Sequence, residues 1–136
     1  MKKILFLSTA LFLFLSCKKA AENILQDAVI SAMTDGQWAI TSFTDNGNDS
    51  TSSFSGYRFQ YYSNKTVDAI KNGTLVQTGS WDGSATSMTT WANFPQATSP
   101  LNLINGTWHI DNNSWTFVVA SQTNGSETKS MRLDKQ

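Results

Sequence analysis

The residue types that could carry nucleophilic or metal chemistry are scarce in this chain. Its 136 residues include one cysteine, Cys17, and one histidine, His109. A disulfide needs a second cysteine, a zinc site needs several Cys or His ligands, and a Ser–His–Asp set needs a histidine held between its partners. His109 lies between Trp108 and Ile110, so on a strand it would face away from both. We therefore expect no enzyme activity, no cofactor and no metal site.

The charged residues add no catalytic pattern. Ten basic and ten acidic residues give a formal net charge of zero, and no basic patch indicates nucleic acid binding. The acidic residues are scattered over expected turns, without the facing pair that a glycosidase needs. Asp45, Asn48 and Asp49 could offer oxygen ligands to calcium, but Gly56 stands where an EF-hand has its bidentate Glu. A solvated hairpin loop is the favoured interpretation.

The position of Cys17 suggests a role for its thiol. Lys2 and Lys3 precede an apolar stretch over residues 4–15, which as a helix would reach about 18 Å, against about 30 Å of bilayer hydrocarbon. Such a segment fits a signal peptide rather than a membrane span. The residues that follow, Leu15-Ser16-Cys17, resemble the lipobox of bacterial lipoproteins, although Phe14 occupies the position where that motif usually has Leu.

The lipobox resemblance implies cleavage before Cys17 and acylation of this residue. Residues 1–16 would then be a lipoprotein signal peptide, and residues 17–35 a lipidated tether with a short helix. Several acyl chains on one residue suffice for stable anchoring without a span. We expect the mature protein at the outer membrane, facing the periplasm or the cell surface.

Hydrophobic periodicity separates a helix from a β domain. Residues 20–34 place Ile24, Leu25, Ala28, Val29 and Ala32 on one helical face, and Asp35-Gly36 is a plausible stop. Beyond Gly36 the period becomes two, and Asn-Gly and Asp-Gly pairs mark hairpin turns. The expected strands are 37–44, 54–62, 66–71, 74–82, 86–92, 107–111, 114–120 and 128–134. This predicts a mainly β domain over residues 36–136, an eight-stranded antiparallel up-and-down barrel preceded by a short N-terminal helix, with a sandwich as the alternative.

Alternation along these strands predicts which side chains face the interior, and most of them are aromatic or branched. The inward set is Trp38, Ile40, Tyr57, Phe59, Tyr61, Val67, Ala69, Leu75, Trp81, Trp108, Ile110, Trp115, Phe117, Val119, Met131 and Leu133. An eight-stranded barrel has room for its own side chains or for one small ligand. A filled core and a small apolar cavity both remain open.

The triplet Gly-x-Trp occurs at residues 36–38, 79–81 and 106–108. The first copy opens the first expected strand and resembles the Gly-x-Trp of lipocalins, as the strand count does. The whole chain is similar to small lipocalin-like bacterial lipoproteins. This resemblance implies that Trp38 closes one end of the barrel and that Arg132, near the last strand, packs over it through a cation–π contact.

Two functions follow from this interpretation. The first is a membrane-anchored lipoprotein whose lipocalin-like domain binds a small hydrophobic ligand in contact with Tyr57, Phe59 and Trp81. The alternative is a structural or interaction module with a filled core, whose surface or exposed Trp91–Phe94 segment binds a partner protein or a glycan.

Overall fold

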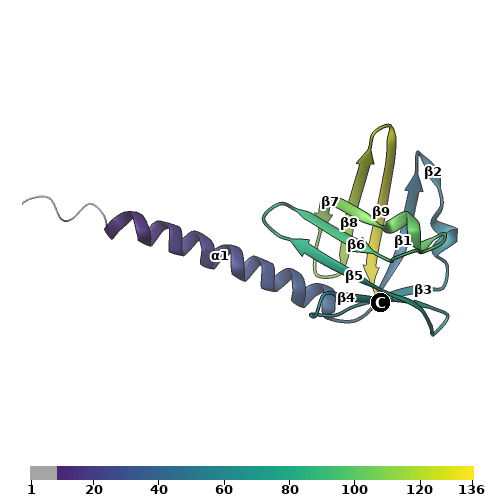
Figure 1. The fold of residues 1–136 in the computed structure, drawn as a ribbon, viewed down its shortest axis with the longest axis horizontal. Coiled ribbons are helices and arrows are strands. Elements are labelled where there is room, and N and C mark those ends of the chain that lie inside the picture. Colours follow the sequence, from purple (N-terminus) through teal and green to yellow (C-terminus); the bar gives the residue numbers. More distant parts are fainter. Residues whose placement is uncertain (1–8) are drawn as a thin grey trace, which may run out of the picture.

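The computed structural model describes the backbone of residues 9–136 and the side chains from Lys18 onward. The predicted signal peptide lies partly, and the Cys17 side chain wholly, outside what is described. The described chain forms one long helix and one antiparallel sheet (Figure 1). The helix is α1 (Thr9–Thr34), and the strands are β1 (Trp38–Asp45), β2 (Asn48–Asp49), β3 (Tyr57–Tyr61), β4 (Thr66–Lys71), β5 (Thr74–Ser84), β6 (Thr89–Asn93), β7 (Gly106–Asn113), β8 (Phe117–Asn124) and β9 (Glu127–Lys135).

The sheet closes into a barrel of eight strands, which confirms the predicted fold class. Neighbours along the chain pair antiparallel from β3 to β9, and β9 pairs with β1 from Trp38↔Lys135 to Asp45↔Lys129. The two-residue strand β2 is a small extension on the end of β1. β1 and β3 pair only at Trp38↔Phe59, so this is the shortest strand pairing in the barrel.

Hairpin turns form at two of the Asn-Gly pairs, whereas the turn expected at Asp82-Gly83 is wrong, because both residues lie inside β5, where Gly83 pairs with Thr90. Asn46 and Gly47 have φ values of 50° and 80°, and Asn72 and Gly73 have 49° and 80°. Positive φ at both central residues is the requirement of a type I′ turn, which matches the twist of the flanking strands. The predicted strand positions are therefore confirmed to within a few residues.

Helix α1 is longer than predicted. The expected helix over 20–34 is present, but it begins at Thr9 and passes through Cys17 without a break. Nothing in residues 9–19 would stop a helix, because the segment contains Ala, Leu and Lys and neither Gly nor Pro. The helix ends at Thr34, and Gly36 follows with φ 82°, as the Asp35-Gly36 pair predicted. No helix in the described part of the chain has the length and hydropathy needed to cross a membrane.

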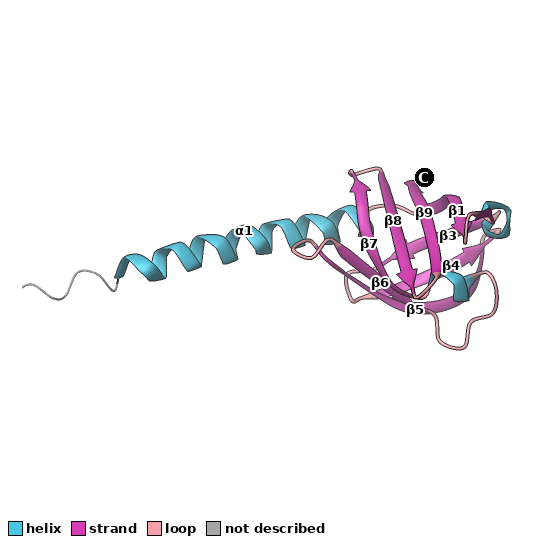
Figure 2. Cartoon of the chain, turned by 90° about the horizontal axis from the view of Figure 1, so that it is seen from above, coloured by secondary structure: helices cyan, strands magenta, loops and turns pink. Residues whose placement is uncertain are grey.

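Only the C-terminal part of α1 contacts the barrel, and the rest extends away from one barrel end (Figure 2). The Gln26 amide donates to the Gly83 carbonyl at 2.5 Å, and the Ala85 N–H donates to the Gln26 side-chain oxygen at 3.0 Å. Ile30 and Met33 pack against the barrel core. The part of α1 from Gln26 to its end is thus fixed to the barrel, with Gln26 bound at the end of β5.

The opposite end of the barrel is closed by two 3₁₀ helices, η1 (Thr51–Phe54) and η2 (Leu101–Ile104). Phe54 and Leu101 are buried there, and the Phe43 and Phe54 rings lie 4.9 Å apart. Phe94 is 1 % exposed and its ring is 6.3 Å from that of Phe59. This half of the interior is filled by side chains.

Four of the predicted inward residues were assigned wrongly. Leu75 and Trp115 are 56 % and 59 % exposed, whereas Val118 and Ala120 are buried in place of their neighbours Phe117 and Val119. β8 begins at Phe117 because residues 114–117 form a turn, in which the Ser114 N–H donates to the Phe117 carbonyl at 2.9 Å. An alternation counted from Trp115 therefore starts in the turn and exchanges the two faces of the strand.

Candidate functional site

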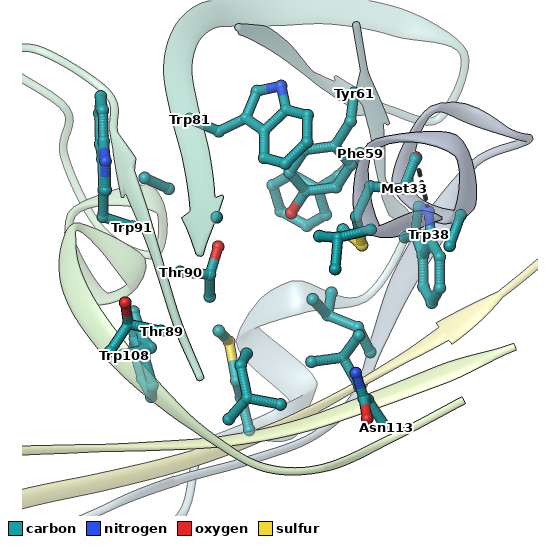
Figure 3. A pocket seen from close by; sticks show the side chains of 18 of the residues that line it. Met33, Trp38, Phe59, Tyr61, Trp81, Thr89, Thr90, Trp91, Trp108 and Asn113 are labelled. Carbon is teal, nitrogen blue, oxygen red and sulfur yellow. Dashed lines mark hydrogen bonds between the residues drawn. The ribbon is translucent and has the colours of Figure 1, made fainter. Parts of the chain in front are cut away.

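A cavity of about 90 Å³ lies inside the α1 end of the barrel. Figure 3 shows side chains from several strands converging on it, with Tyr61, Phe59 and Trp81 on one side and Trp108 on another. Val29, Met33 and other residues of α1 complete the wall. The cavity is therefore bounded by β-barrel residues below and by the last turns of the helix at its mouth.

The three buried tryptophans of this region have satisfied indole N–H groups. Trp38 donates to the Met33 carbonyl at 3.0 Å, Trp81 to the Tyr62 carbonyl at 3.0 Å, and Trp108 to the Ile104 carbonyl at 2.9 Å. Each indole nitrogen is thus bound to backbone, which leaves the carbon edges and faces of the rings to form the wall. These bonds also hold the rings in fixed orientations.

Tyr61 differs from the tryptophans in having a free polar end. The residue is 9 % exposed and its ring stands edge-on to Trp81, with centroids 5.1 Å apart. Figure 3 shows its hydroxyl pointing into the cavity, where it keeps accessible surface, and it has no hydrogen bond to another described residue. Burial raises the pKa of this hydroxyl, so it stays protonated and can both donate and accept.

Two of the three predicted ligand-contacting residues line the cavity. Phe59 and Trp81 do so, but Tyr57 does not. Tyr57 faces the interior nearer the 3₁₀ helices, where its ring is 6.3 Å from that of Phe54 and the Lys71 ammonium lies 5.1 Å from its centroid. Period-two alternation correctly placed all three inward, but it gives no information on depth along the barrel axis.

The predicted contact between Arg132 and Trp38 is wrong. Arg132 points outward between the buried residues Met131 and Leu133, and its guanidinium carbon lies 4.5 Å from the Phe117 ring centroid. Lys135 takes the predicted place, with its ammonium 5.2 Å from the Trp38 ring. The register explains this difference. Trp38 of β1 pairs with Lys135 of β9, so their two side chains lie on the same face of the sheet.

The expected exposure of the Trp91–Phe94 segment is confirmed for Trp91 and is wrong for Phe94. Phe94 is part of the filled core, and Trp91, which is 39 % exposed, lies at the rim of the cavity. Figure 3 shows Trp91 standing apart from the deeper aromatic rings. A partly exposed tryptophan at this place can contact both solvent and anything that enters the cavity.

Sequence reasoning missed the contribution of α1 to this site. Val29, Ala32 and Met33 line the cavity, and two of them, Val29 and Ala32, belong to the apolar helical face identified from the sequence. The signal was thus present, but the place where the face docks could not be deduced. Met88, which has φ 52°, also lines the cavity from the connection between β5 and β6.

The charged groups near this end lie outside the cavity. The Lys65 ammonium is 2.7 Å from an Asp82 carboxylate oxygen, and this hydrogen bond lowers the pKa of the Asp82 carboxyl. The Lys65 ammonium also lies 5.4 Å from the Trp81 ring centroid. None of the residues that line the cavity is Asp, Glu, Lys, Arg or His.

The single histidine lies on the outer face of β7. Its Nδ1 is 3.0 Å from an Asp111 carboxylate oxygen, and the Ser121 hydroxyl donates to that same oxygen at 3.1 Å. The carboxylate therefore stands between histidine and serine, whereas nucleophilic catalysis needs the histidine in the middle. Among the residues from Lys18 onward, no group of three His, Cys, Asp or Glu is placed to hold a metal ion.

Comparison with known proteins supports the fold. No protein-family model and no curated protein matches the chain. A solved structure, the crystal structure of a DUF4847 family protein from Bacteroides vulgatus ATCC 8482, superposes with a TM-score of 0.54 and 14 % sequence identity. The match covers 79 % of this chain and 99 % of that chain, so the two proteins are similar in fold over nearly the whole length of the neighbour.

Proposed function

We propose that this protein is a lipoprotein held at the outer membrane by acyl chains on Cys17, and that its barrel binds a small hydrophobic ligand. The observation that carries the ligand-binding part is the apolar cavity at the α1 end, whose lining includes no charged side chain. Natural ligand sites are concave and mostly apolar, with a few placed polar groups.

The geometry of α1 is compatible with the anchor. A continuous helix from Cys17 would place Gln26, where α1 hydrogen-bonds to the barrel, about 14 Å from the acylated residue, since each residue adds about 1.5 Å. The exposed stretch of this helix would act as a spacer between membrane and barrel. Because the cavity lies at the end where α1 attaches, its mouth would face the side from which membrane-derived apolar molecules arrive.

Cys17→Ser tests the anchor by cell fractionation. We expect the variant to leave the membrane pellet and appear in the soluble fraction, because the acylation chemistry needs the thiol. Ser16→Ala is the matched control, since it keeps a small residue before the cysteine and should leave the protein in the pellet. A Cys17→Ser protein that pellets as firmly as wild type would exclude the anchor.

Cavity filling tests ligand binding. Ala92 lines the cavity, so Ala92→Leu should occupy part of it and weaken the binding of small apolar compounds, measured through tryptophan fluorescence. Ala20→Leu adds the same carbons on the exposed part of α1 and should leave binding unchanged. If wild type and Ala92→Leu bind equally well, the cavity is not the binding site.

The outer surface supports a second candidate, an interaction module. Trp115 is 59 % exposed in the turn before β8, and Leu75 and Val76 are 56 % and 49 % exposed near the start of β5. Exposed aromatic side chains can stack on sugars or on a partner protein. Trp115→Ser should then abolish binding on a glycan array or to a captured partner without changing cavity occupancy.

A further inference from the structure

The cavity has features that restrict its ligand to one chemical class, and this inference rests on the proposed ligand-binding function. The first feature is the absence of charge. No acidic or basic residue lines the cavity, and the nearest ammonium groups described above, those of Lys65 and Lys135, lie over the rings of Trp81 and Trp38. An ionised group taken into such a site would lose its hydration without gaining a counter-ion, which is strongly unfavourable.

The second feature is the hydroxyl of Tyr61, a polar group that a largely buried residue turns toward the cavity. Trp38, Trp81 and Trp108 all have backbone partners for their indole N–H groups, whereas no described residue accepts from or donates to the Tyr61 hydroxyl. Thr90, which also lines the cavity, already donates its hydroxyl hydrogen to the Asp82 carbonyl at 2.9 Å. Because no fully buried side-chain oxygen or nitrogen among the described residues lacks a partner, the Tyr61 hydroxyl keeps some accessible surface, which faces the cavity and can receive a ligand atom.

The third feature is size. The cavity volume of about 90 Å³ is smaller than the roughly 150 Å³ of a dry engineered cavity that accommodates benzene. A ligand that enters fully must therefore be slender. A longer one would extend from the mouth between α1 and the β5–β6 connection, past Trp91 at the rim.

From these three features we propose that the cavity selects an uncharged, slender, apolar molecule that carries one hydrogen-bonding oxygen, and that the Tyr61 hydroxyl binds this oxygen. An alkyl alcohol or an aliphatic carbonyl compound has this chemistry, whereas a free fatty acid in its ionised form does not. Phe59 and Trp81 contact the apolar part beside Tyr61.

The test uses hexane, 1-hexanol and hexanoate at neutral pH, with wild-type protein and Tyr61→Phe, and tryptophan fluorescence or calorimetry as the readout. Tyr61→Phe should weaken 1-hexanol binding roughly two- to tenfold, the range of a net neutral hydrogen bond. The same substitution should leave hexane binding unchanged. Hexanoate should bind wild type more weakly than 1-hexanol does.

Tyr57→Phe is the matched control, because it removes the same atom from a tyrosine outside the cavity and should not alter 1-hexanol affinity. Equal 1-hexanol affinity in wild type and Tyr61→Phe would overturn the role of Tyr61 while leaving the proposed function standing. Hexanoate binding as tight as that of 1-hexanol would overturn the selection for uncharged ligands. If none of the three compounds binds wild type, both the proposed function and this inference are rejected.

Discussion

Trp38 has no exposed surface, donates its indole N–H to the Met33 carbonyl, and lies beneath the Lys135 ammonium. These two contacts connect the first strand to the end of α1 and to the last strand. The Trp38 side chain therefore contacts the end of α1 and the last strand, and it also lines the cavity. The resemblance to lipocalins implied that this tryptophan closes one barrel end; the structure buries it, but the cation over its ring is that of Lys135 and not that of Arg132.

Trp38→Ala should lower the free energy of unfolding by about 3–5 kcal/mol, the range for truncating a buried aromatic residue. Denaturant titration followed by circular dichroism measures this change. Trp115→Ala is the control, because Trp115 is 59 % exposed and its truncation should change the free energy of unfolding by less than about 0.5 kcal/mol. A loss below about 1 kcal/mol for Trp38→Ala would show that Trp38 does not support the core.

At the scale of the strand, the three Gly-x-Trp copies share a pattern but use glycine for different reasons. Gly36 and Gly106 have φ values of 82° and 101°, which residues with a side chain rarely adopt. Gly79 lies within β5, where a Cβ atom would collide with the Asn93 carbonyl oxygen and lie 2.8 Å from the Phe94 ring. The first and third copies stand at the beginning of a strand, and the middle copy lets β5 and the segment after β6 approach closely.

Gly79→Ala should therefore destabilise the barrel by about 1–3 kcal/mol, the cost typical of overpacking, because the obstructing oxygen belongs to the backbone and cannot move aside. Gly83→Ala is a control on the same strand, since its Cβ would lie 3.5 Å from Val29, an ordinary contact. The thermal midpoint of Gly83→Ala should stay near that of wild type. Equal midpoints for Gly79→Ala and Gly83→Ala would contradict the proposed close approach.

Strand order and most turn positions could be predicted from the sequence, but the continuation of β5 through Asp82-Gly83 and the face of β8 could not. Alternation along residues 115–119 fits both registers, because Trp115, Phe117, Val118 and Val119 are all apolar. The structure selects the register with Val118 and Ala120 inside and places Phe117 under Arg132 on the outer face. Only tertiary packing distinguishes these registers, since each leaves an apolar residue exposed.

For the whole molecule, the sequence indicated a closed barrel with an aromatic interior but not where that interior is empty. Tyr57, Phe59 and Trp81 all face inward, yet only Phe59 and Trp81 reach the cavity. The difference depends on the 3₁₀ helices filling one barrel end and on α1 docking at the other. Both depend on long-range contacts, such as the one between Gln26 and Gly83, that no local pattern encodes.

The charged residues on β9, which pairs with β1 to close the barrel, predict how the stability of the fold changes in acid. The Asp134 carboxylate accepts hydrogen bonds from Arg132 at 2.8 and 2.9 Å and from Thr41 on the neighbouring strand β1, and these bonds hold the pKa of the Asp134 carboxyl below its usual value. A carboxyl whose pKa is lower in the folded state stabilises the fold above its unfolded pKa of about 3.9, and this stabilisation is lost as pH falls through the folded value. Asp82 contributes in the same direction through Lys65.

The denaturation midpoint should therefore change little between pH 7 and pH 5 through these two groups and decline below about pH 4. Asp134→Asn should lower the midpoint at pH 7 and show a shallower decline in acid, so that its curve converges with that of wild type at low pH. Asp27→Asn, on the exposed face of α1, should follow the wild-type curve throughout. If the midpoints of Asp134→Asn and wild type differ by the same amount at every pH down to pH 2, the ionised Asp134 carboxylate does not stabilise the folded state.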